Sequence, residues 1–195
     1  RELDRQKVHA ECRKQSAELW ENWQGNAEKH PYLVGKNVKA YGLKLYKQSL
    51  MIPVRDGVGT LHGLQFIAPD GTKKFKTGTA VTGCYHEIGT PNRTILIAEG
   101  YATGATLHEV TGHAVAIAFN CGNLRPVVEA MRVKYPELGI IICADDDHAT
   151  EGDVPRGHAL REGDEVGGDP EARRTEPCSE PPERADHLVE DEVGT

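Results

Sequence analysis

The sequence predicts an α/β fold built on a parallel sheet, and three observations support this class. Two apolar runs each end at carboxylates: Ile95–Ala98 runs into Glu99, and Ile140–Ala144 runs into Asp145–Asp147. Each run is too short for a helix and too uniformly apolar for a strand with one wet face, which indicates buried strands. Strand and helix patterns alternate between residues 94 and 144, as in βαβ units. The length of 195 residues suits one domain with a real core.

The first part of the chain predicts a helix followed by a small antiparallel meander. Residues 2–23 are rich in Glu, Lys, Arg, Gln and Ala, with apolar residues spaced loosely along one helical face, and Gly25-Asn26 ends the pattern. The β-type segments that follow are separated by Gly-containing turns. We expect these strands at residues 50–54, 61–67 and 73–76.

From residue 91 the pattern predicts three strands joined by two helices. Gly112 ends the first helix and Pro136 ends the second. Right-handed crossovers would place the three strands in one parallel sheet, with Glu99 and Asp145 at the same edge. The expected strands are 94–98, 114–119 and 139–144, and the expected helices are 103–110 and 124–135.

The chain divides by composition near residue 150. Residues 151–195 hold 14 acidic and 5 basic residues, repeated Gly and Pro, and no Lys, Tyr or Trp, so we expect a disordered acidic tail. Residues 1–150 are left with 16 acidic and 18 basic residues, which is compatible with weak binding of a phosphate backbone. We expect an N-terminal helix in 1–29, a β-rich segment in 30–90, the α/β core in 91–150, and the tail beyond it.

Cysteine usage and hydropathy point to a cytoplasmic protein without a membrane segment. The five cysteines are widely spaced and form no CxxC pair, which favours reduced thiols over a disulfide framework or a zinc finger. No apolar stretch approaches the roughly 20 residues needed to span a bilayer.

The carboxylates at the two strand ends predict a metal site. Because ligands bind outside the carboxyl ends of strands in open α/β sheets, Glu99, Asp145 and Asp147 could converge although they are far apart in sequence. Three carboxylates in one cleft require a cation to stay ionised, and hard oxygen ligands favour Mg²⁺ or Mn²⁺. Strand alternation points Asp146 away from its two neighbours. As an alternative, an Asp triplet can be a solvated turn and Glu-Gly a strand terminator.

Four further residues are substrate-binding candidates. Gly100 lets substrate or backbone approach Glu99, and Asn120 follows the middle strand at the same rim. Of the hairpin lysines at 73, 74 and 76, we take Lys74 and Lys76 as able to grip phosphates. Two alternatives stay open: lysines on an edge strand prevent aggregation, and Asn120 can belong to a helix entry.

The acidic motifs resemble those of the Toprim domains found in primases, topoisomerases, OLD-type nucleases and RecR-like proteins. The first motif is Ile97-Ala98-Glu99-Gly100-Tyr101, of the primase form, and the second is Asp145-Asp146-Asp147. Upstream segments also resemble the Toprim primases of plasmids, integrative elements and phages. These segments are His30-Pro31-Tyr32-Leu33, Ile52-Pro53-Val54-Arg55-Asp56, Leu64-Gln65-Phe66-Ile67 and Gly83-Cys84-Tyr85-His86.

The resemblance implies metal-dependent nucleotidyl transfer. Asp145 and Asp147 would hold Mg²⁺ or Mn²⁺, and Glu99 would act as general base or as a further metal-side carboxylate. The implied activity is primer synthesis from ribonucleotides on single-stranded DNA, with a replicative helicase as a possible partner. Two other readings remain: an OLD-like nuclease, and a shortened, non-catalytic Toprim module that binds nucleic acid. The family's zinc-ribbon module is missing from the pattern, and the tail does not continue the core as Toprim domains usually do.

Overall fold

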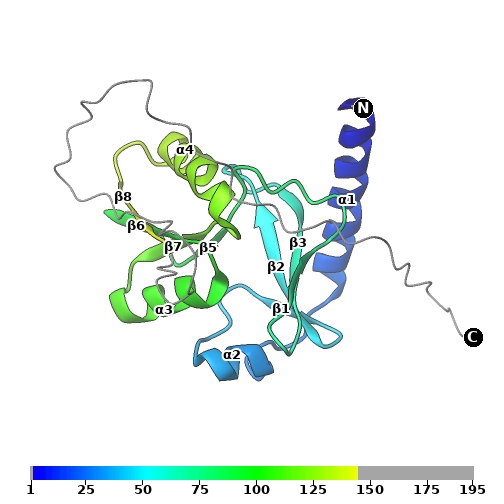
Figure 1. The fold of residues 1–195 in the computed structure, drawn as a ribbon, viewed down its shortest axis with the longest axis horizontal. Coiled ribbons are helices and arrows are strands. Elements are labelled where there is room, and N and C mark those ends of the chain that lie inside the picture. Colours follow the sequence, from blue (N-terminus) through cyan, green and yellow to red (C-terminus); the bar gives the residue numbers. More distant parts are fainter. Residues whose placement is uncertain (1, 145–195) are drawn as a thin grey trace, which may run out of the picture. The chain divides into compact units, whose positions relative to one another are not determined.

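Two four-stranded sheets make up the part of the protein that the computed structural model describes, residues 2–144 (Figure 1). The antiparallel sheet has the strand order β1-β2-β3-β4, and the second sheet has the order β5-β7-β6-β8. The predicted α/β class, with an N-terminal helix and an antiparallel meander before the parallel strands, is confirmed. The expected disorder of residues 151–195 lies outside the described residues.

The antiparallel sheet follows the predicted meander with one added strand. Its strands are β1 Lys44–Tyr46, β2 Ser49–Arg55, β3 Leu61–Ile67 and β4 Lys73–Phe75. The Asp56 side chain accepts hydrogen bonds from the amides of Val58 and Thr60, which closes the β2–β3 turn. The short strand β1 was not predicted, because its sequence has no apolar run.

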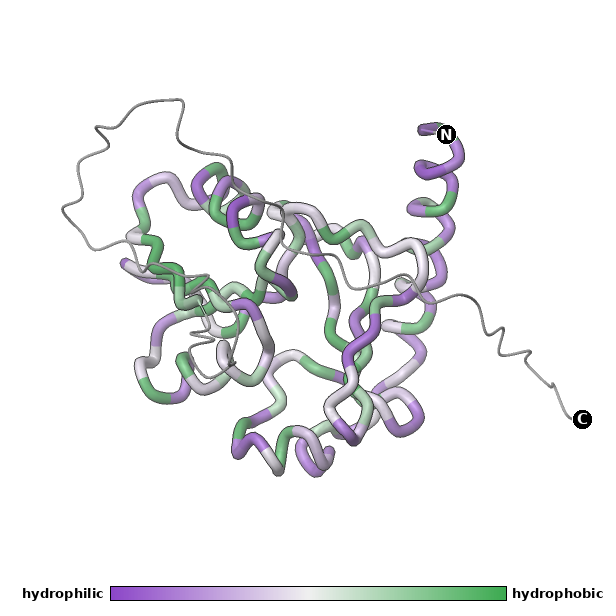
Figure 2. Tube along the Cα trace, viewed as in Figure 1, coloured by the Kyte–Doolittle hydropathy of each residue, from purple (hydrophilic) through white to green (hydrophobic). Residues whose placement is uncertain are grey.

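The helix α1 (Glu2–Asn22) packs on β3 and buries few of its own side chains. Cys12 and Ser16 are its buried residues, whereas Leu3 and Val8 are 72% and 51% exposed. The expected apolar face is therefore not buried along its length. Figure 2 agrees, since the helix is coloured mostly hydrophilic. Besides β3, the helix contacts the segment after β4: the His9 Nδ1 atom lies 2.8 Å from the Gly78 carbonyl oxygen, and the Cys12 Sγ atom lies 3.7 Å from the Thr79 hydroxyl.

The second sheet is mixed rather than wholly parallel. The strands β6 (Thr94–Ala98), β7 (Ala114–Ile117) and β8 (Gly139–Cys143) are parallel as predicted. Strand β5 (His86–Ile88), which was not predicted, pairs antiparallel with β7. The helices α3 (Tyr101–Thr111) and α4 (Leu124–Lys134) connect the parallel strands close to their expected bounds.

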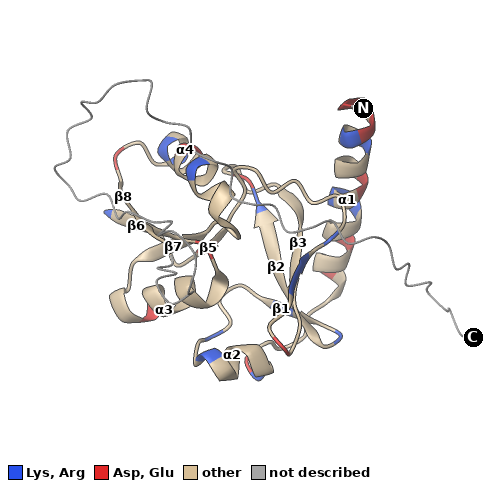
Figure 3. Ribbon diagram, viewed as in Figure 1, with Lys and Arg blue, Asp and Glu red and all other residues tan. Residues whose placement is uncertain are grey.

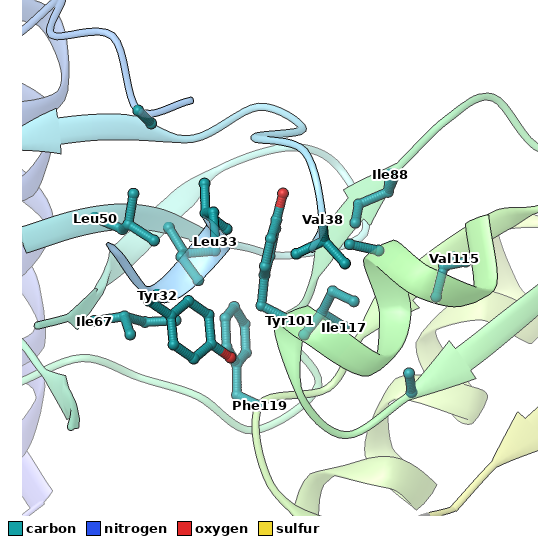
Figure 4. Packing of buried hydrophobic residues seen from close by; sticks show 14 of the residues in the cluster. Tyr32, Leu33, Val38, Leu50, Ile67, Ile88, Tyr101, Val115, Ile117 and Phe119 are labelled. Carbon is teal, nitrogen blue, oxygen red and sulfur yellow. The ribbon is translucent and has the colours of Figure 1, made fainter. Parts of the chain in front are cut away.

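A shared apolar core joins the two sheets (Figure 4). Side chains from the antiparallel sheet, among them Leu50 and Ile67, contribute to the same cluster as Tyr101 and Ile117. The short helix α2 (Pro31–Lys36) adds Leu33, and it begins at His30, whose side chain accepts from the Tyr32 amide. The two sheets are therefore one packed unit within the described residues.

None of the helices in residues 2–144 combines the length and the apolar character that a membrane crossing requires.

Candidate active site

Glu99 lies at the carboxyl end of the central strand β6. Strand β8 pairs with β6 in parallel register, and Ala98 stands opposite Cys143. The chain therefore leaves β6 at Glu99 and β8 at Ala144 on the same edge of the sheet, as predicted. Asp145 and Asp147 lie outside the described residues, so their position beside Glu99 stays a prediction.

The turn after Glu99 brings a lysine close to the strand end. Glu99 and Gly100 are half-buried, and Gly100 is the N-cap of α3 without a side-chain cap. A Cβ atom on Gly100 would stand 3.3 Å from the Lys73 Nζ atom. The absence of a side chain at Gly100 therefore leaves room for the ammonium group beside the Glu99 turn. The predicted role of Gly100, to permit close approach, concerns substrate and stays a prediction.

A cleft of about 580 Å³ opens at this strand end. Helix α2, the β3–β4 turn and the first turn of α3 form its walls. Its charged lining residues are Lys36, Asp70 and Lys73. Since α3 begins at this cleft, the partial positive charge of its amino end adds to that of the two lysines. The cleft therefore favours an anionic ligand.

Asp70 is committed to its own turn and does not cancel this positive charge fully. Its carboxylate accepts a hydrogen bond from the Thr72 amide at 2.9 Å. Hydrogen bonds from Thr72 lower the pKa of Asp70, with a smaller contribution from the charge of Lys74. Asp70 thus stays ionised at neutral pH and shapes the β3–β4 turn.

Two tyrosines attach the first turn of α3 to the preceding part of the chain. The Tyr101 hydroxyl accepts from the Tyr41 amide at 2.6 Å and donates to the Lys39 carbonyl at 2.8 Å. Tyr101 is 1% exposed, and burial raises the pKa of its phenol. Burial also raises the pKa of the Tyr32 phenol. A hydrogen bond between Tyr32 and the Ala102 backbone acts in the opposite direction and lowers that pKa. Glu99 is therefore followed by a helix start that is fixed from two sides.

Lys74 and Lys76 are not among the residues that line this cleft. Side chains alternate along β4, so Lys73 and Phe75 share one face while Lys74 takes the other. Phe75 packs against Phe119 in the core, which identifies the inner face. Lys76 follows β4, and its amide donates to the Leu64 carbonyl at 2.8 Å. The hairpin lysine that lies at the Glu99 turn is Lys73.

Asn120 serves as a helix cap in the structure. Its side chain accepts from the Asn123 amide at 3.0 Å at the start of the short helix η1 (Cys121–Asn123). Asn120 is exposed, and the helix-entry alternative accounts for its contacts. Whether it also contacts substrate stays untested.

Asn123 directly precedes α4 but makes no side-chain capping bond there, because its side chain is buried in other hydrogen bonds. It is 3% exposed and donates to the carbonyls of Cys84 and Ala118. Its side-chain oxygen accepts from the Gly83 amide at 2.8 Å. Asn123 thus joins the loop before β5 to the end of β7, and a buried, fully bonded amide of this kind has no periodic signature in sequence.

Within residues 2–144, no three His, Cys, Asp or Glu side chains gather as metal ligands would. Glu99 is the member of the predicted metal set that the described part contains. The other two predicted oxygen donors, Asp145 and Asp147, come after the end of β8 in the sequence and lie outside the described residues. Carboxylates are ligands that a divalent cation prefers, so the chemistry of the three predicted donors fits such an ion.

Comparisons with known proteins agree with this arrangement. The family model of the Toprim domain matches residues 94–165. Two DNA primases TraC of Escherichia coli are similar in sequence: one is 37% identical over 132 residues and 64% of this chain, the other 38% over 125 residues and 60%. The matches cover 12% and 9% of those two proteins, so the chain spans about a tenth of their length.

Two solved structures are similar at low identity. One is bacteriophage T7 lagging-strand DNA polymerase interacting with primase domains bound to an RNA/DNA hybrid and dTTP, with a TM-score of 0.44 and 14% identity. That match covers 65% of this chain and 68% of the other. The second is the DnaG catalytic core, with a TM-score of 0.36, 13% identity, and coverage of 65% and 47%.

Proposed function

We propose that this chain, which contains a Toprim domain and is homologous to the TraC DNA primases, catalyses metal-dependent nucleotidyl transfer. The proposed reaction joins ribonucleotides into a primer on single-stranded DNA. The same resemblance suggests replication of a mobile element, in the cytoplasm, with a replicative helicase as partner. The reaction, the cellular setting and the partner are thus all proposed, and they rest on the similarity to Toprim primases.

The observation that carries the proposal is the register of β6 and β8. Ala98 opposite Cys143 means that strands β6 and β8 end at the same edge of the sheet, where the chain continues into Glu99 and into Ala144. We propose that both acidic motifs lie at this edge. A cleft with two lysines in its lining opens at the same edge, which suits a substrate rich in phosphate.

A divalent cation would be held by Glu99, Asp145 and Asp147. These residues supply the oxygen ligands that Mg²⁺ and Mn²⁺ accept. When bound, such an ion neutralises charge that develops on phosphate oxygens and positions the attacking hydroxyl.

The residues of the cleft would bind and orient the nucleotide. Lys73, next to Gly100, would donate hydrogen bonds to phosphate oxygens, and the amides at the start of α3 would favour the same negative charge. Glu99 would accept the proton of the attacking 3′-hydroxyl or assist the cation. Tyr32 and Tyr101 would keep the start of α3 in position while charge builds up.

Primer synthesis by the full chain tests the proposal. We would follow incorporation of labelled ribonucleotides on single-stranded DNA with Mg²⁺, with Mn²⁺ and with chelator, comparing Glu99→Gln and Asp145→Asn with the parent. Glu129→Gln is the matched control, because this substitution makes the same chemical change as Glu99→Gln. Glu129 is an exposed carboxylate on α4 that pairs with Arg125. We expect incorporation to need metal and to fall about 10²-fold or more in the two site variants alone.

The same reactions separate the other two readings. Shortening of end-labelled DNA without incorporation would indicate a nuclease and overturn the primase proposal. Metal binding in calorimetry without either activity would indicate a non-catalytic module. Loss of metal binding in Glu99→Gln and in Asp145→Asn, but not in Glu129→Gln, would support the predicted ligand set even then.

A further inference from the structure

We propose that helix α2 is a binding element of the cleft beside Glu99, in which the Tyr32 hydroxyl and the Lys36 ammonium hold the pyrophosphate that nucleotidyl transfer releases. Neither residue is among the four substrate-binding candidates of the sequence. The role of pyrophosphate as the leaving group rests on the proposed function, whereas the binding itself does not.

Helix α2 forms one wall of the cleft and is held firmly at its start. The residues of α2 that line the cleft are Pro31, Tyr32, Gly35 and Lys36. The His30 Nδ1 atom accepts from the Tyr32 amide, and the other ring nitrogen of His30 donates to the Gln48 carbonyl at 3.0 Å. These bonds tie the first turn of α2 to the turn before β2, so this wall has a fixed position.

The Tyr32 ring is packed in the core while its hydroxyl lies at the cleft. Tyr32 is 8% exposed and belongs to the same apolar cluster as Ile67 and Phe119 (Figure 4). A Cβ atom on Gly71 would stand 3.5 Å from the ring, so the β3–β4 turn lies against it. The hydroxyl interacts with the backbone of Ala102, which also lines the cleft. Packing of the ring therefore fixes where the hydroxyl stands.

The Tyr32 hydroxyl has a proton to donate. Burial raises the pKa of the phenol, and the weaker, opposing effect of the Ala102 backbone is that of an amide that donates to the oxygen. The hydroxyl therefore keeps its proton at neutral pH. Residues 2–144 offer this proton no acceptor, in contrast to Tyr101, whose hydroxyl donates to the Lys39 carbonyl. An oxygen of a ligand would complete the hydrogen bonds of Tyr32.

Two elements of the cleft each contribute an ammonium group. Lys36 is the last residue of α2, Lys73 is the first of β4, and both line the cleft. In Figure 3, α2 and β4 both carry basic segments. Lys36 takes part in none of the ion pairs found within residues 2–144. Cations from two separate elements suit an anion that has more than one phosphate group.

Pyrophosphate matches the groups that the cleft offers. Its ionised oxygens accept hydrogen bonds, and the Tyr32 hydroxyl, both ammonium groups and the amino end of α3 all favour an acceptor with negative charge. Orthophosphate carries less charge and has fewer oxygens, so it can meet fewer of these groups at once. The cleft should therefore prefer linked phosphate groups to a single one.

The position of the cleft agrees with a site for the leaving group. Gly100 lines the cleft and directly follows Glu99. In nucleotidyl transfer the 3′-oxygen, which gives up its proton to a base, forms a bond to the α-phosphorus. The bond from that phosphorus to the bridging oxygen breaks, and pyrophosphate leaves with the electron pair. The β- and γ-phosphates of the nucleotide would occupy the same place before the reaction, so pyrophosphate and nucleotide should compete.

Calorimetric titration of the full chain with sodium pyrophosphate, in chelator and without DNA or nucleotide, tests the proposal. The parent should bind pyrophosphate more tightly than orthophosphate. Tyr32→Phe should weaken pyrophosphate binding about tenfold, because it removes one hydrogen bond to a charged group. Lys36→Gln should weaken it several-fold and reduce the preference over orthophosphate.

Tyr135→Phe and Lys39→Gln are the matched controls. The Tyr135 hydroxyl contacts Glu87, the Lys39 side chain is exposed beyond α2, and neither residue lines the cleft. Both control variants should bind pyrophosphate as the parent does, and thermal unfolding of Tyr32→Phe and Lys36→Gln should stay close to that of the parent.

Nuclear magnetic resonance of the chain with isotope-labelled tyrosine separates direct contact from mere support of α3. The Tyr32 signal, identified by its loss in Tyr32→Phe, should move when pyrophosphate is added, whereas the Tyr135 signal should not. A lower affinity of Tyr32→Phe without movement of the Tyr32 signal would mean that the hydroxyl only supports the start of the helix, and would overturn the proposal.

Three further results would overturn it: no binding of pyrophosphate by the parent, unchanged affinity in Tyr32→Phe, or equal losses in the variants and their controls. A ribonucleoside triphosphate should displace bound pyrophosphate, and a failure to do so would exclude the leaving-group role. Primer synthesis that is absent while pyrophosphate binding persists would overturn the proposed function alone.

Discussion

In the two edge strands of the mixed sheet, the more polar strand β5 is buried and the more apolar strand β8 is partly exposed. Strand β5 has the sequence His-Glu-Ile, yet His86 and Ile88 are 6% and 1% exposed. Strand β8 has the sequence Gly-Ile-Ile-Ile-Cys, yet within the described residues Ile141 and Ile142 are 53% and 43% exposed. The segment around Tyr41 covers strand β5, where the His86 side chain donates to the Tyr41 carbonyl. Burial at a sheet edge therefore depends on which other segment covers it, and apolar composition alone does not reveal it.

The largest expected effect comes from truncating one isoleucine at each edge. Ile88→Ala should lower the free energy of unfolding by about 2–5 kcal/mol, because it leaves a cavity in a packed core. Ile141→Ala should cost less than about 1 kcal/mol, because half of that side chain is already exposed. Urea unfolding measures both. Equal losses would mean that β8 is covered as fully as β5, and the contrast between the edges would disappear.

The hydroxyl of Tyr101 should contribute less, through the loop that covers β5. Tyr101→Phe leaves the Tyr41 amide and the Lys39 carbonyl without this partner, so we expect a loss of about 1–3 kcal/mol in unfolding free energy. Tyr135→Phe is the control, since its hydroxyl makes a long 3.4 Å bond to Glu87 in a half-buried position. A larger loss in the control than in Tyr101→Phe would show that the β5 edge does not depend on this link.

The histidine on β5 should make stability depend on pH. Burial lowers the pKa of His86 to about 4, although its hydrogen bond to the Tyr41 carbonyl opposes the shift. The unfolded chain has a pKa of about 6.5 at this residue, so below that pH the unfolded state binds more protons. Stability is complete above pH 6.5 and should fall by about 1.4 kcal/mol per pH unit as the pH drops toward 4.

His86→Gln should flatten this part of the pH profile, because glutamine does not titrate and can still donate to the Tyr41 carbonyl. His113→Gln, at an exposed position, should keep the slope of the parent. Unfolding free energies between pH 4 and 7 give the comparison, and an unchanged slope in His86→Gln would remove His86 as its source.

A small effect on stability is expected at Gly100, the N-cap of α3 that follows the inner strand β6. Its φ of −108° suits any residue, but alanine is a poorer N-cap than glycine, so Gly100→Ala should lower the unfolding free energy by about 0.5–1 kcal/mol. The new Cβ atom would displace the Lys73 ammonium, and nucleotide affinity should fall several-fold. A double-mutant cycle with Lys73→Ala measures the coupling. Additive losses of affinity would show that Gly100 and Lys73 do not act together.

The sequence predicted the long elements better than the short ones. Strands β6 and β8 and helix α4 start where expected, because uniform apolar runs and stop signals such as Pro136 mark them clearly. Strands β1 and β5 were missed since three residues are too few to show a period. Helix α2 was missed because six residues are too few to show a helical period, although a proline as first residue is typical of a helix start.

The sheet edge at which the chain leaves β6 and β8 was predicted, whereas the metal ligands and substrate-binding residues stay predictions. The shared edge of Glu99 and the chain after β8 followed from the βαβ pattern. The sequence could not show which lysine lies beside Gly100. A shift of one residue along β4 exchanges the two faces of the strand, and only its pairing with β3 determines which face each lysine takes. The lysines at 73 and 74 are alike in sequence, and the register alone assigns one to each side.

The hydrogen bonds of the Tyr101 hydroxyl also limit how far this chain can be shortened from its amino end. The hydroxyl reaches back 60 residues to Tyr41, and His86 reaches back 45 residues to the same loop. A fragment that begins near residue 91 would carry Glu99 and the parallel strands but would expose Tyr101 and the edge of β7 with which β5 pairs. The parallel strands are therefore not a detachable module, and any shorter version must keep the β-rich segment that precedes them.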